Sequence, residues 1–347
     1  MKKLHLTLFL ILLLTVLFIT LNEVKSSNEV MNQPAFEYKN NFSKYVEHVP
    51  IIINSNDDFI SYGFPGNGSL ENPYIIQNYN ITTNAEYGIR ICCIDKKYTI
   101  KDCNINLEYN TTSYAIYLKD SPEYCSILNN TCQNCYFGIY LDHCSTMMIA
   151  NNTLNNNTKG FYVFNSYQLT IIQNLCSYNE FLGFDFYDCV WIAITHNFFS
   201  FNMQDALKLH YTQHCLLILN TFLENSGYAV ILSSNTDSVE IYQNNFTENA
   251  KLFDAQAYDS GTNNLWYNQD TLSGNFWSDL GEFCFYYLDG TAGSYDAYPL
   301  NSETNCFTNI PSSLSTIPTS QTSLSFCIIT LTLVMLLPKK QLKNKEK

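Results

Sequence analysis

The sequence predicts an all-β fold, a single-stranded right-handed parallel β-helix with coils of about 22–24 residues. The first observation behind this prediction is a motif, an aliphatic residue followed three positions later by Asn, that recurs at spacings of 22, 22, 23, 23 and 24 residues. Its asparagines form one column: Asn130, Asn152, Asn174, Asn197, Asn220 and Asn244. The second observation is another column five residues further on, with Cys135 in the first unit and then Asn157, Asn179, Asn202, Asn225 and Asn249. The right hand is inferred from the usual preference of parallel crossovers.

Each repeat predicts short strands rather than helices. The repeats offer alternating stretches of three to five residues, broken by Asn, Gly and Ser, and no window has the 3.6-residue period of a helix. Coils of short strands stack at about 4.8 Å, so equivalent residues lie above one another. Stacked asparagines can form an amide ladder, and Asn tolerates the left-handed backbone of a tight corner. The competing hypothesis, a leucine-rich repeat, requires Leu positions and a helical side that are absent here.

The two ends of the chain predict export and anchoring. Two lysines and an apolar run predict a signal peptide over 1–26, with an uncleaved N-terminal anchor as the alternative. We expect the β-helix domain with its caps over 27–300, a Ser/Thr/Pro spacer over 301–323, a transmembrane anchor helix over 324–338 and a basic tail over 339–347. Basic residues prefer the cytoplasm, so the tail is expected inside and the domain on the extracellular face of the membrane. Replacement of the tail by a covalent lipid anchor is the second alternative.

The charge of the chain excludes one class of partner. The 347 residues have a formal net charge of −13, and between residues 27 and 337 only 10 basic residues face 29 acidic ones. Such a surface repels a phosphate backbone, so nucleic acid is excluded as a partner. With 46% hydrophobic residues, the chain is also too apolar to be disordered.

Two segments outside the repeats carry a family resemblance. Residues 66–76 read Gly-Asn-Gly-Ser-Leu-Glu-Asn-Pro-Tyr-Ile-Ile, and residues 274–279 read Gly-Asn-Phe-Trp-Ser-Asp. With the repeats between them, these segments resemble the pectin-lyase-like β-helix proteins, most closely the NosD-like group, over roughly residues 50–300. The sequence departs from that pattern at 283–287, where Phe-Cys-Phe-Tyr-Tyr replaces a more polar stretch. The resemblance implies the β-helix and an association with copper delivery.

Aligned outward positions give the candidate site. Weak candidates for catalysis lie on two successive coils, and they are Asp185, Asp188, Lys208 and His210. Candidates for ligand binding are the aromatic side chains Tyr140, Tyr162, Tyr187 and Tyr211. Carboxylates, a cation and an imidazole on one face could serve a hydrolase with two carboxylates or a lyase with a base and a clamp for an acidic sugar. The alternative is an ordinary solvated face, which we favour because no compact catalytic motif is present.

Cysteines and metal-binding residues give no strong signal. Cys132 and Cys176 occupy one coil position, as do Cys144 and Cys189, but each pair is two coils apart and beyond disulfide reach, so we expect small buried hydrophobes. Six His and six Met are not clustered, so no metal site or cofactor is predicted. Residues 265–300 are the expected C-terminal cap, and seven of its aromatic residues are expected to cover the core: Trp266, Phe276, Trp277, Phe283, Phe285, Tyr286 and Tyr287. Its carboxylates are expected to keep a second molecule from docking, and calcium bound by them is the weaker alternative.

Three functional hypotheses follow from these features. The first is a monomeric, cell-surface-anchored and non-catalytic protein that binds a polysaccharide or another envelope component, or that serves adhesion or envelope structure. The second is a polysaccharide lyase or hydrolase that uses the face over 185–211. The third, which the resemblance implies, is an accessory protein for copper-centre maturation. The sequence indicates the architecture clearly but provides little evidence for a catalytic site, which favours the first hypothesis.

Overall fold

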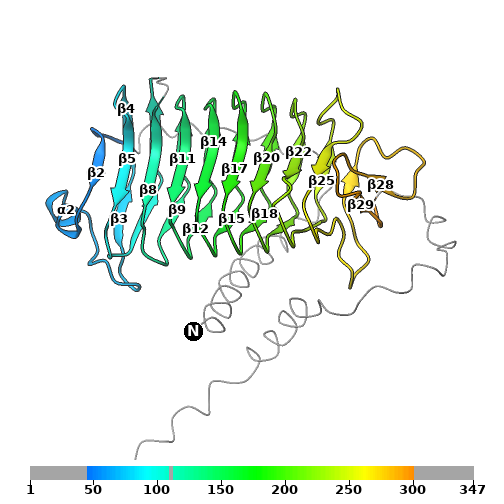
Figure 1. The fold of residues 1–347 in the computed structure, drawn as a ribbon. Coiled ribbons are helices and arrows are strands. Elements are labelled where there is room, and N and C mark those ends of the chain that lie inside the picture. The colour runs from blue at the N-terminus through cyan, green and yellow to red at the C-terminus, as the bar shows by residue number, and fades with distance from the viewer. Residues whose placement is uncertain (1–44, 109–111, 301–347) are drawn as a thin grey trace, which may run out of the picture. The chain divides into compact units, whose positions relative to one another are not determined.

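The structure, a computed structural model, describes residues 45–108 and 112–300. They form a right-handed parallel β-helix of about eight coils with roughly 23 residues each, which confirms the predicted fold class for these residues (Figure 1). The predicted signal peptide, spacer, anchor and basic tail lie outside the described residues. Within the described part of the chain, no helix combines the length and the apolar character that crossing a membrane requires.

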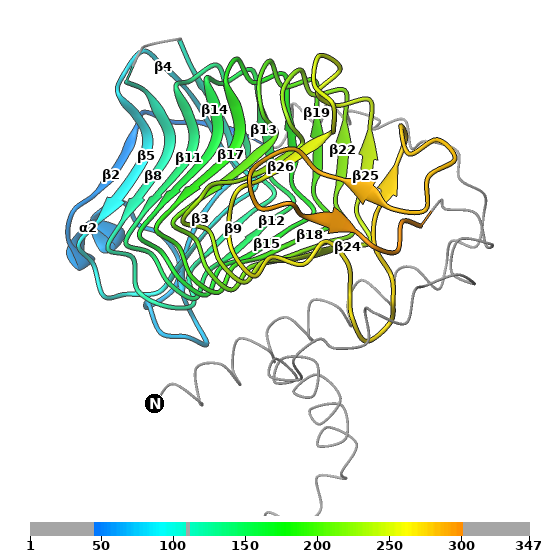
Figure 2. The same cartoon turned by 45° about the vertical axis from the view of Figure 1, so that its right-hand side comes forward.

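Three parallel sheets run along the axis of the β-helix, and each complete coil adds one strand to each of them (Figure 2). Sheet A consists, in spatial order, of β1 (Val46–Glu47), β4 (Tyr79–Thr83), β7 (Asn104–Leu107), β10 (Thr131–Gln133), β13 (Thr153–Asn155), β16 (Leu175–Ser177), β19 (Phe198–Ser200), β22 (Thr221–Leu223), β25 (Asn245–Thr247) and β27 (Phe276–Trp277). Sheet B consists of β2 (Ile51–Ile53), β5 (Tyr87–Cys92), β8 (Tyr114–Lys119), β11 (Phe137–Asp142), β14 (Lys159–Phe164), β17 (Leu182–Tyr187), β20 (Leu207–His210), β23 (Val230–Leu232) and β26 (Ala257–Asp259). Sheet C consists of β3 (Tyr74–Gln77), β6 (Tyr98–Lys101), β9 (Ser126–Leu128), β12 (Met148–Ala150), β15 (Thr170–Ile172), β18 (Ala193–Thr195), β21 (Leu216–Ile218) and β24 (Glu240–Tyr242).

The two ends of the β-helix have elements of their own. A short helix, α2 (Asn56–Ser61), lies at the N-terminal end and buries Phe59 (Figure 1). At the other end β28 (Tyr286–Tyr287) and β29 (Tyr295–Asp296) form an antiparallel pair. Because a stack of coils exposes unpaired backbone at both ends, such additions keep a second molecule from pairing there.

The first asparagine column is a continuous buried ladder between sheets C and A. Each Nδ2 donates to the Oδ1 of the next asparagine, as Asn174 does to Asn197 at 2.9 Å and Asn197 does to Asn220 at 3.1 Å. The same Oδ1 also accepts the backbone N–H of the preceding ladder residue. The ladder extends beyond the repeats, because Asn244 donates at 3.0 Å to Asn275, which follows an insertion.

The second column forms a parallel ladder between sheets A and B. Its amides donate to one another at 2.8 Å from Asn179 to Asn202 and again from Asn225 to Asn249. Cys135 takes part at the N-terminal end, where its Sγ lies 2.8 Å from Oδ1 of Asn157. One detail of the prediction is wrong, because the ladder asparagines do not adopt the left-handed backbone. Within the repeats, the residue before each ladder asparagine adopts it instead, as Asn151 does with φ of 56°.

The core is filled by stacked aromatic and aliphatic columns. On the inner side of sheet A the rings of Phe199, Phe222, Phe246 and Trp277 stack at centroid distances of 4.8, 5.0 and 4.1 Å. Trp277 then stacks on Tyr286 at 3.9 Å, so the column ends inside the C-terminal cap. Of the seven aromatic residues predicted to cover the core, the buried ones are Trp266, Trp277 and Tyr286. Phe276, Phe283 and Tyr287 are instead exposed, so the prediction is wrong for these three residues.

Both ladders end on side chains of the cap. Oδ2 of the buried Asp296 accepts the backbone N–H of Asn275 at 2.7 Å and Nε1 of Trp277 at 2.9 Å. Burial raises the pKa of Asp296 to about 6. The second ladder passes from Asn249 to Gln256, whose Nε2 donates to Asp279 at 2.6 Å. The carboxylates of Asp296 and Asp279 thus accept hydrogen bonds from N–H groups of the protein, and each of them ends one of the two ladders.

Candidate functional site

The outer side of sheet B carries most of the chemistry that the described residues offer. In the six-residue strands the second, third and fifth residues are buried. Side chains alternate from the third residue onward, so the fourth and sixth residues point outward, as does the first. We call the outward side chains of β5, β8, β11, β14, β17 and β20 the cationic face. Four of the eight Lys and Arg residues in the described part of the chain belong to it: Arg90, Lys119, Lys159 and Lys208. Two carboxylates, Asp142 and Asp185, accompany them.

Stacked tyrosines occupy the middle of the cationic face. The rings of Tyr117 and Tyr140 stack at 5.2 Å with an interplanar angle of 19°, and Tyr140 stacks on Tyr162 at 5.0 Å and 24°. Since each ring covers the next, the edges rather than the faces of Tyr140 and Tyr162 border the solvent. Burial raises the pKa of Tyr140 and of Tyr162, so both phenols stay protonated at neutral pH and can donate hydrogen bonds.

One charged cluster is centred on Asp142. Nζ of Lys119 lies 2.7 Å from Oδ2, and Nδ1 of His143 lies 2.5 Å from Oδ1. The other ring nitrogen of His143 lies 2.7 Å from Nδ2 of Asn165, which belongs to the next coil. Burial tends to raise the pKa of Asp142, but the bonds from Lys119 and His143 outweigh it, and the pKa is lowered overall.

A second charged cluster is centred on Asp185. Its Oδ2 accepts Nζ of Lys159 at 2.7 Å, and its Oδ1 lies 4.0 Å from Nε2 of His210. Lys208 occupies the neighbouring register position on the next strand. Burial and the nearby charge of Lys208 lower the pKa of His210, so its imidazole is neutral at neutral pH. The carboxylate of Asp205 also lies near Lys208 and Asp185, and burial raises its pKa. The cluster therefore combines two ammonium groups, two carboxyl groups and a neutral imidazole.

The structure brings some of the predicted site residues together and separates others. Asp185, Lys208 and His210 lie on adjacent strands. Asp188 instead lies at the corner after β17, exposed and with φ of 55°. Tyr187 and Tyr211 meet near this corner with ring centroids 5.1 Å apart.

Sequence reasoning missed Lys159, the direct partner of Asp185. Lys159 immediately precedes Gly160, whereas the aligned outward positions that gave the candidate site begin two residues after Gly160, at Tyr162. Lys119 and Arg90 were missed for a different reason, since they belong to coils in which the repeat is imperfect. A comparison of every outward position, including the one before the small residue, could have found Lys159.

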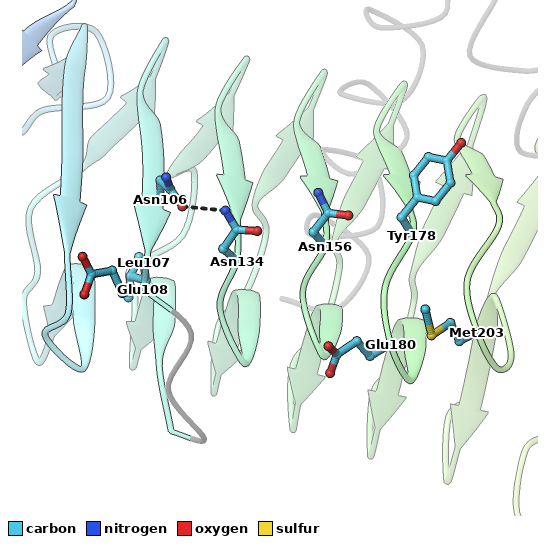
Figure 3. A pocket seen from close by; sticks show the side chains of 8 residues that line it. All are labelled: Asn106, Leu107, Glu108, Asn134, Asn156, Tyr178, Glu180 and Met203. Carbon is cyan, nitrogen blue, oxygen red and sulfur yellow. Dashed lines mark hydrogen bonds between the residues drawn. The ribbon is translucent and has the colours of Figure 1, made fainter.

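A groove beside the first residues of the sheet B strands has a different character. It has a volume of about 560 Å³ and lies at the corner between sheets A and B (Figure 3). Nδ2 of Asn134 donates to Asn106 within it at 2.8 Å. The lining residues are Asn106, Leu107, Glu108, Asn134, Asn156, Tyr178, Glu180 and Met203. Two carboxylates and no cation line the groove, so it would repel an anionic ligand.

No metal centre is apparent in the described ranges. Within 45–108 and 112–300, no three or more His, Cys, Asp or Glu side chains are arranged as ligands for a metal ion. The closing carboxylates proposed for calcium do not converge, since Asp279 accepts the Tyr286 hydroxyl at 2.9 Å and Asp289 accepts that of Tyr228 at 3.0 Å.

The chain is similar to several solved structures at low sequence identity. A point mutant of the periplasmic alginate epimerase AlgG has a TM-score of 0.47 and 16% identity over 54% of this chain and 47% of that chain, so the chain spans about half its length. Unmutated AlgG has a TM-score of 0.40 and 12% identity, with 67% and 72% covered. The Dettilon tailspike protein has a TM-score of 0.34 and 10% identity, with 66% and 59% covered. No curated protein matches the chain.

One protein family matches most of the described β-helix. Its description is "Periplasmic copper-binding protein (NosD)", and it matches residues 66–282, which is more than half of the chain. The matched range contains the opening segment 66–76 and the closing Gly-Asn-Phe-Trp-Ser-Asp segment on which the resemblance rests. The chain therefore belongs to the NosD family of parallel β-helix proteins.

Proposed function

We propose that the chain is a non-catalytic glycan-binding protein whose cationic face binds an acidic polysaccharide. The observation that supports this proposal is the distribution of charge. Four cations and two carboxylates make the cationic face net positive, although the whole chain has a formal net charge of −13. Gathering its few cations on one sheet does not make an acidic protein more soluble. A binding site for anions, in contrast, requires cations that lie close together.

The spacing of the cations suits a polymer rather than a small ion. Arg90 and Lys119 lie on neighbouring coils, and Lys159 and Lys208 follow at intervals of two coils, where one coil spans about 4.8 Å. The cations are therefore spread over six coils, and a chain of uronate sugars that lies along the axis could contact them in turn, whereas a small ion could not. Ammonium and guanidinium groups form charge-assisted hydrogen bonds with such carboxylates, and the tyrosine phenols between them can donate to sugar hydroxyls.

Titration of the purified protein with an acidic and a neutral polysaccharide tests the proposal. We expect binding to polygalacturonate or alginate that weakens as salt increases, and no binding to amylose. Lys208→Ala should weaken binding roughly fivefold to tenfold, or about 1–1.4 kcal/mol. The matched control is Lys251→Ala, because Lys251 is an exposed lysine beside Glu248 and lies outside the cationic face. Equal binding of both polysaccharides, or equal loss in both variants, would contradict the proposal.

Eliminative cleavage of the same polymer is the second candidate, and the Asp185 cluster favours it. The neutral imidazole of His210 could accept the proton beside a uronate carboxylate while Lys159 and Lys208 stabilise the negative charge that develops. The bond to the next sugar then breaks, its oxygen takes a proton, and a carbon–carbon double bond forms. Hydrolysis is less well supported, because Asp142 and Asp185 are each paired with a lysine. Ultraviolet absorbance of unsaturated products, lost in His210→Gln, distinguishes cleavage from binding.

Copper maturation is the third candidate, which the description of the family suggests. The described residues do not fit a copper centre, because they provide no group of three His, Cys, Asp or Glu side chains that could bind a metal ion. Their three methionines are the adjacent Met147 and Met148 and the distant Met203. His143 and His210 both lie beside aspartates rather than beside soft ligands. We therefore expect fewer than one copper ion to bind per protein in a competition with a chelator.

The proposed location follows from the two ends of the sequence. We propose a monomer on the extracellular face of the membrane, held by 324–338 with the basic tail in the cytoplasm. Support comes from the apolar run followed by lysines and from a family described as periplasmic. Protease added to intact cells should digest the β-helix domain and spare the tail. A tail that is cleaved from outside would overturn the orientation, and a sedimentation coefficient of a dimer would overturn the monomer.

A further inference from the structure

Two adjacent cysteines stand at the end of strand β5. Sγ of Cys92 lies 2.6 Å from Sγ of Cys93, so the two thiol groups face each other. Cys92 is buried with 7% exposure, and Cys93 is exposed. Cys93 has φ of 60° and occupies the corner position that holds His143, Asn165 and Asp188 in later coils. The pair thus joins a protected sulfur to one that solutes can reach.

The other thiols differ from this pair. Eight more free cysteines in the described residues are all buried in the β-helix. Burial raises the pKa of Cys103 to about 11 and that of Cys189 to about 12, so these thiols are protonated and shielded from reagents. Within the described ranges Cys93 is the one exposed free thiol, and it lies against a second thiol.

We propose that Cys92 and Cys93 form a redox-active pair that closes reversibly to a disulfide between neighbouring residues. Neighbouring Cα atoms are about 3.8 Å apart across a trans peptide, which is less than the roughly 4.4–6.8 Å that an ordinary disulfide spans. A disulfide held at this spacing is strained, and strained exposed disulfides are the ones that are reduced readily. The pair therefore suits a switch better than a permanent crosslink.

The chemistry requires a disulfide oxidant of the glutathione class. The exposed Cys93 sulfur, as the thiolate, attacks one sulfur of the oxidant, and a mixed disulfide forms as one small thiol leaves. Cys92 then loses its proton to solvent and attacks Sγ of Cys93, which releases the second small thiol. Two protein thiols are oxidised, and one oxidant disulfide is reduced to two thiols. Burial and the adjacent Cys93 raise the pKa of Cys92, so the exposed sulfur begins the exchange.

The test uses the full-length protein in buffers of reduced and oxidised glutathione. After alkylation and peptide mapping, the wild-type peptide that contains residues 92 and 93 should lose two hydrogens in the oxidising buffer and regain them on reduction. Cys92→Ser is the matched variant, and it should stop at a stable glutathione adduct on Cys93. A wild-type peptide that is fully alkylated in the oxidising buffer, or that keeps a glutathione adduct as Cys92→Ser does, would overturn the proposal.

A second measurement does not depend on the oxidant. A monosubstituted trivalent arsenical binds two neighbouring thiols and should protect the reduced pair from alkylation. Cys93→Ser should lose this protection, whereas Cys215→Ser, which removes a buried core thiol, should retain it. Loss of protection in both variants would show that the arsenical binds elsewhere and would contradict the assignment of the pair.

Discussion

The interior ladders and the cationic face are built from the same coils but follow opposite rules. Inside, the same residue repeats from coil to coil, as Asn174, Asn197 and Asn220 do. Outside, one register column passes from Tyr162 to Asp185 to Lys208. An amide is both donor and acceptor, so identical amides stabilise one another when stacked. Identical charges at the same spacing repel, so charged columns must vary. Residues that repeat from coil to coil therefore maintain the fold, whereas positions that vary form the surface that can acquire a function.

The largest effect is expected where the repeated interior ends. A protein that ends after Asn264 would lose Trp266, Trp277 and Tyr286, which cover the final coil, as well as both ladder ends. We expect aggregated or unfolded protein, because the last coil would expose apolar rings and unpaired strands. A protein that lacks the spacer from Asn309 onward is the control and should stay folded, because it keeps the whole cap and the chain just beyond the disulfide-bonded Cys284. A soluble monomer with an unchanged β-sheet circular dichroism spectrum after the shorter truncation would disprove this role of the cap.

Breaking one ladder should be the next largest effect. Asn197→Leu removes donors to Ile171, Thr195 and Asn220 and the acceptor for Asn174. Each buried polar group left without a partner costs roughly 1–3 kcal/mol, so the free energy of unfolding should fall by about 3 kcal/mol or more. Chemical denaturation measures the change. Asn245→Leu is the control, because Asn245 is exposed in strand β25, lies outside both ladders and has no left-handed backbone. An equal small loss in both variants would contradict the ladder.

The ladder end at Asp296 should make stability depend on pH. Its pKa in the folded protein is raised by burial to about 6 from an ordinary 3.8, so the folded state holds the proton more tightly. The contribution of Asp296 is therefore largest below pH 3.8 and is lost as pH rises through about 6, by up to roughly 3 kcal/mol. Asp296→Asn cannot titrate, so the wild type should lose stability relative to this variant over that interval. A difference that stays constant with pH would refute the expectation.

The smallest effect is expected on the cationic face. Asp142→Asn weakens the contact with Lys119, and such partly exposed ion pairs contribute about 0–1 kcal/mol to stability. We expect a melting temperature within about 4 °C of the wild type, measured by calorimetry. The same variant adds net positive charge to the face, so binding of an acidic polysaccharide should become tighter. A large loss of stability would mean that this face, like the interior, is needed for folding.

Much of the fold could be predicted because the repeat fixes the phase of every coil. Once Asn152 and Asn174 are aligned at one corner, the residues between them fall into register, and the positions of Asp185 and Lys208 on neighbouring strands follow. The prediction weakened where the period is interrupted. Asn275 joins the first ladder after an insertion of unrepeated residues, and no spacing in the sequence identifies it as the successor of Asn244.

The sequence by itself determined the β-helix, its two ladders and its acidic character, because these depend on periodicity and composition. The tertiary structure alone decided which charges meet. Lys159 reaches Asp185 across the gap between two coils, and His143 turns toward Asp142, its own neighbour in the chain. It also decided that the tyrosine rings cover one another and that Asp296 ends a ladder inside the cap. These contacts depend on side-chain direction and on segments that do not repeat, and neither property is encoded in a period of 22–24 residues.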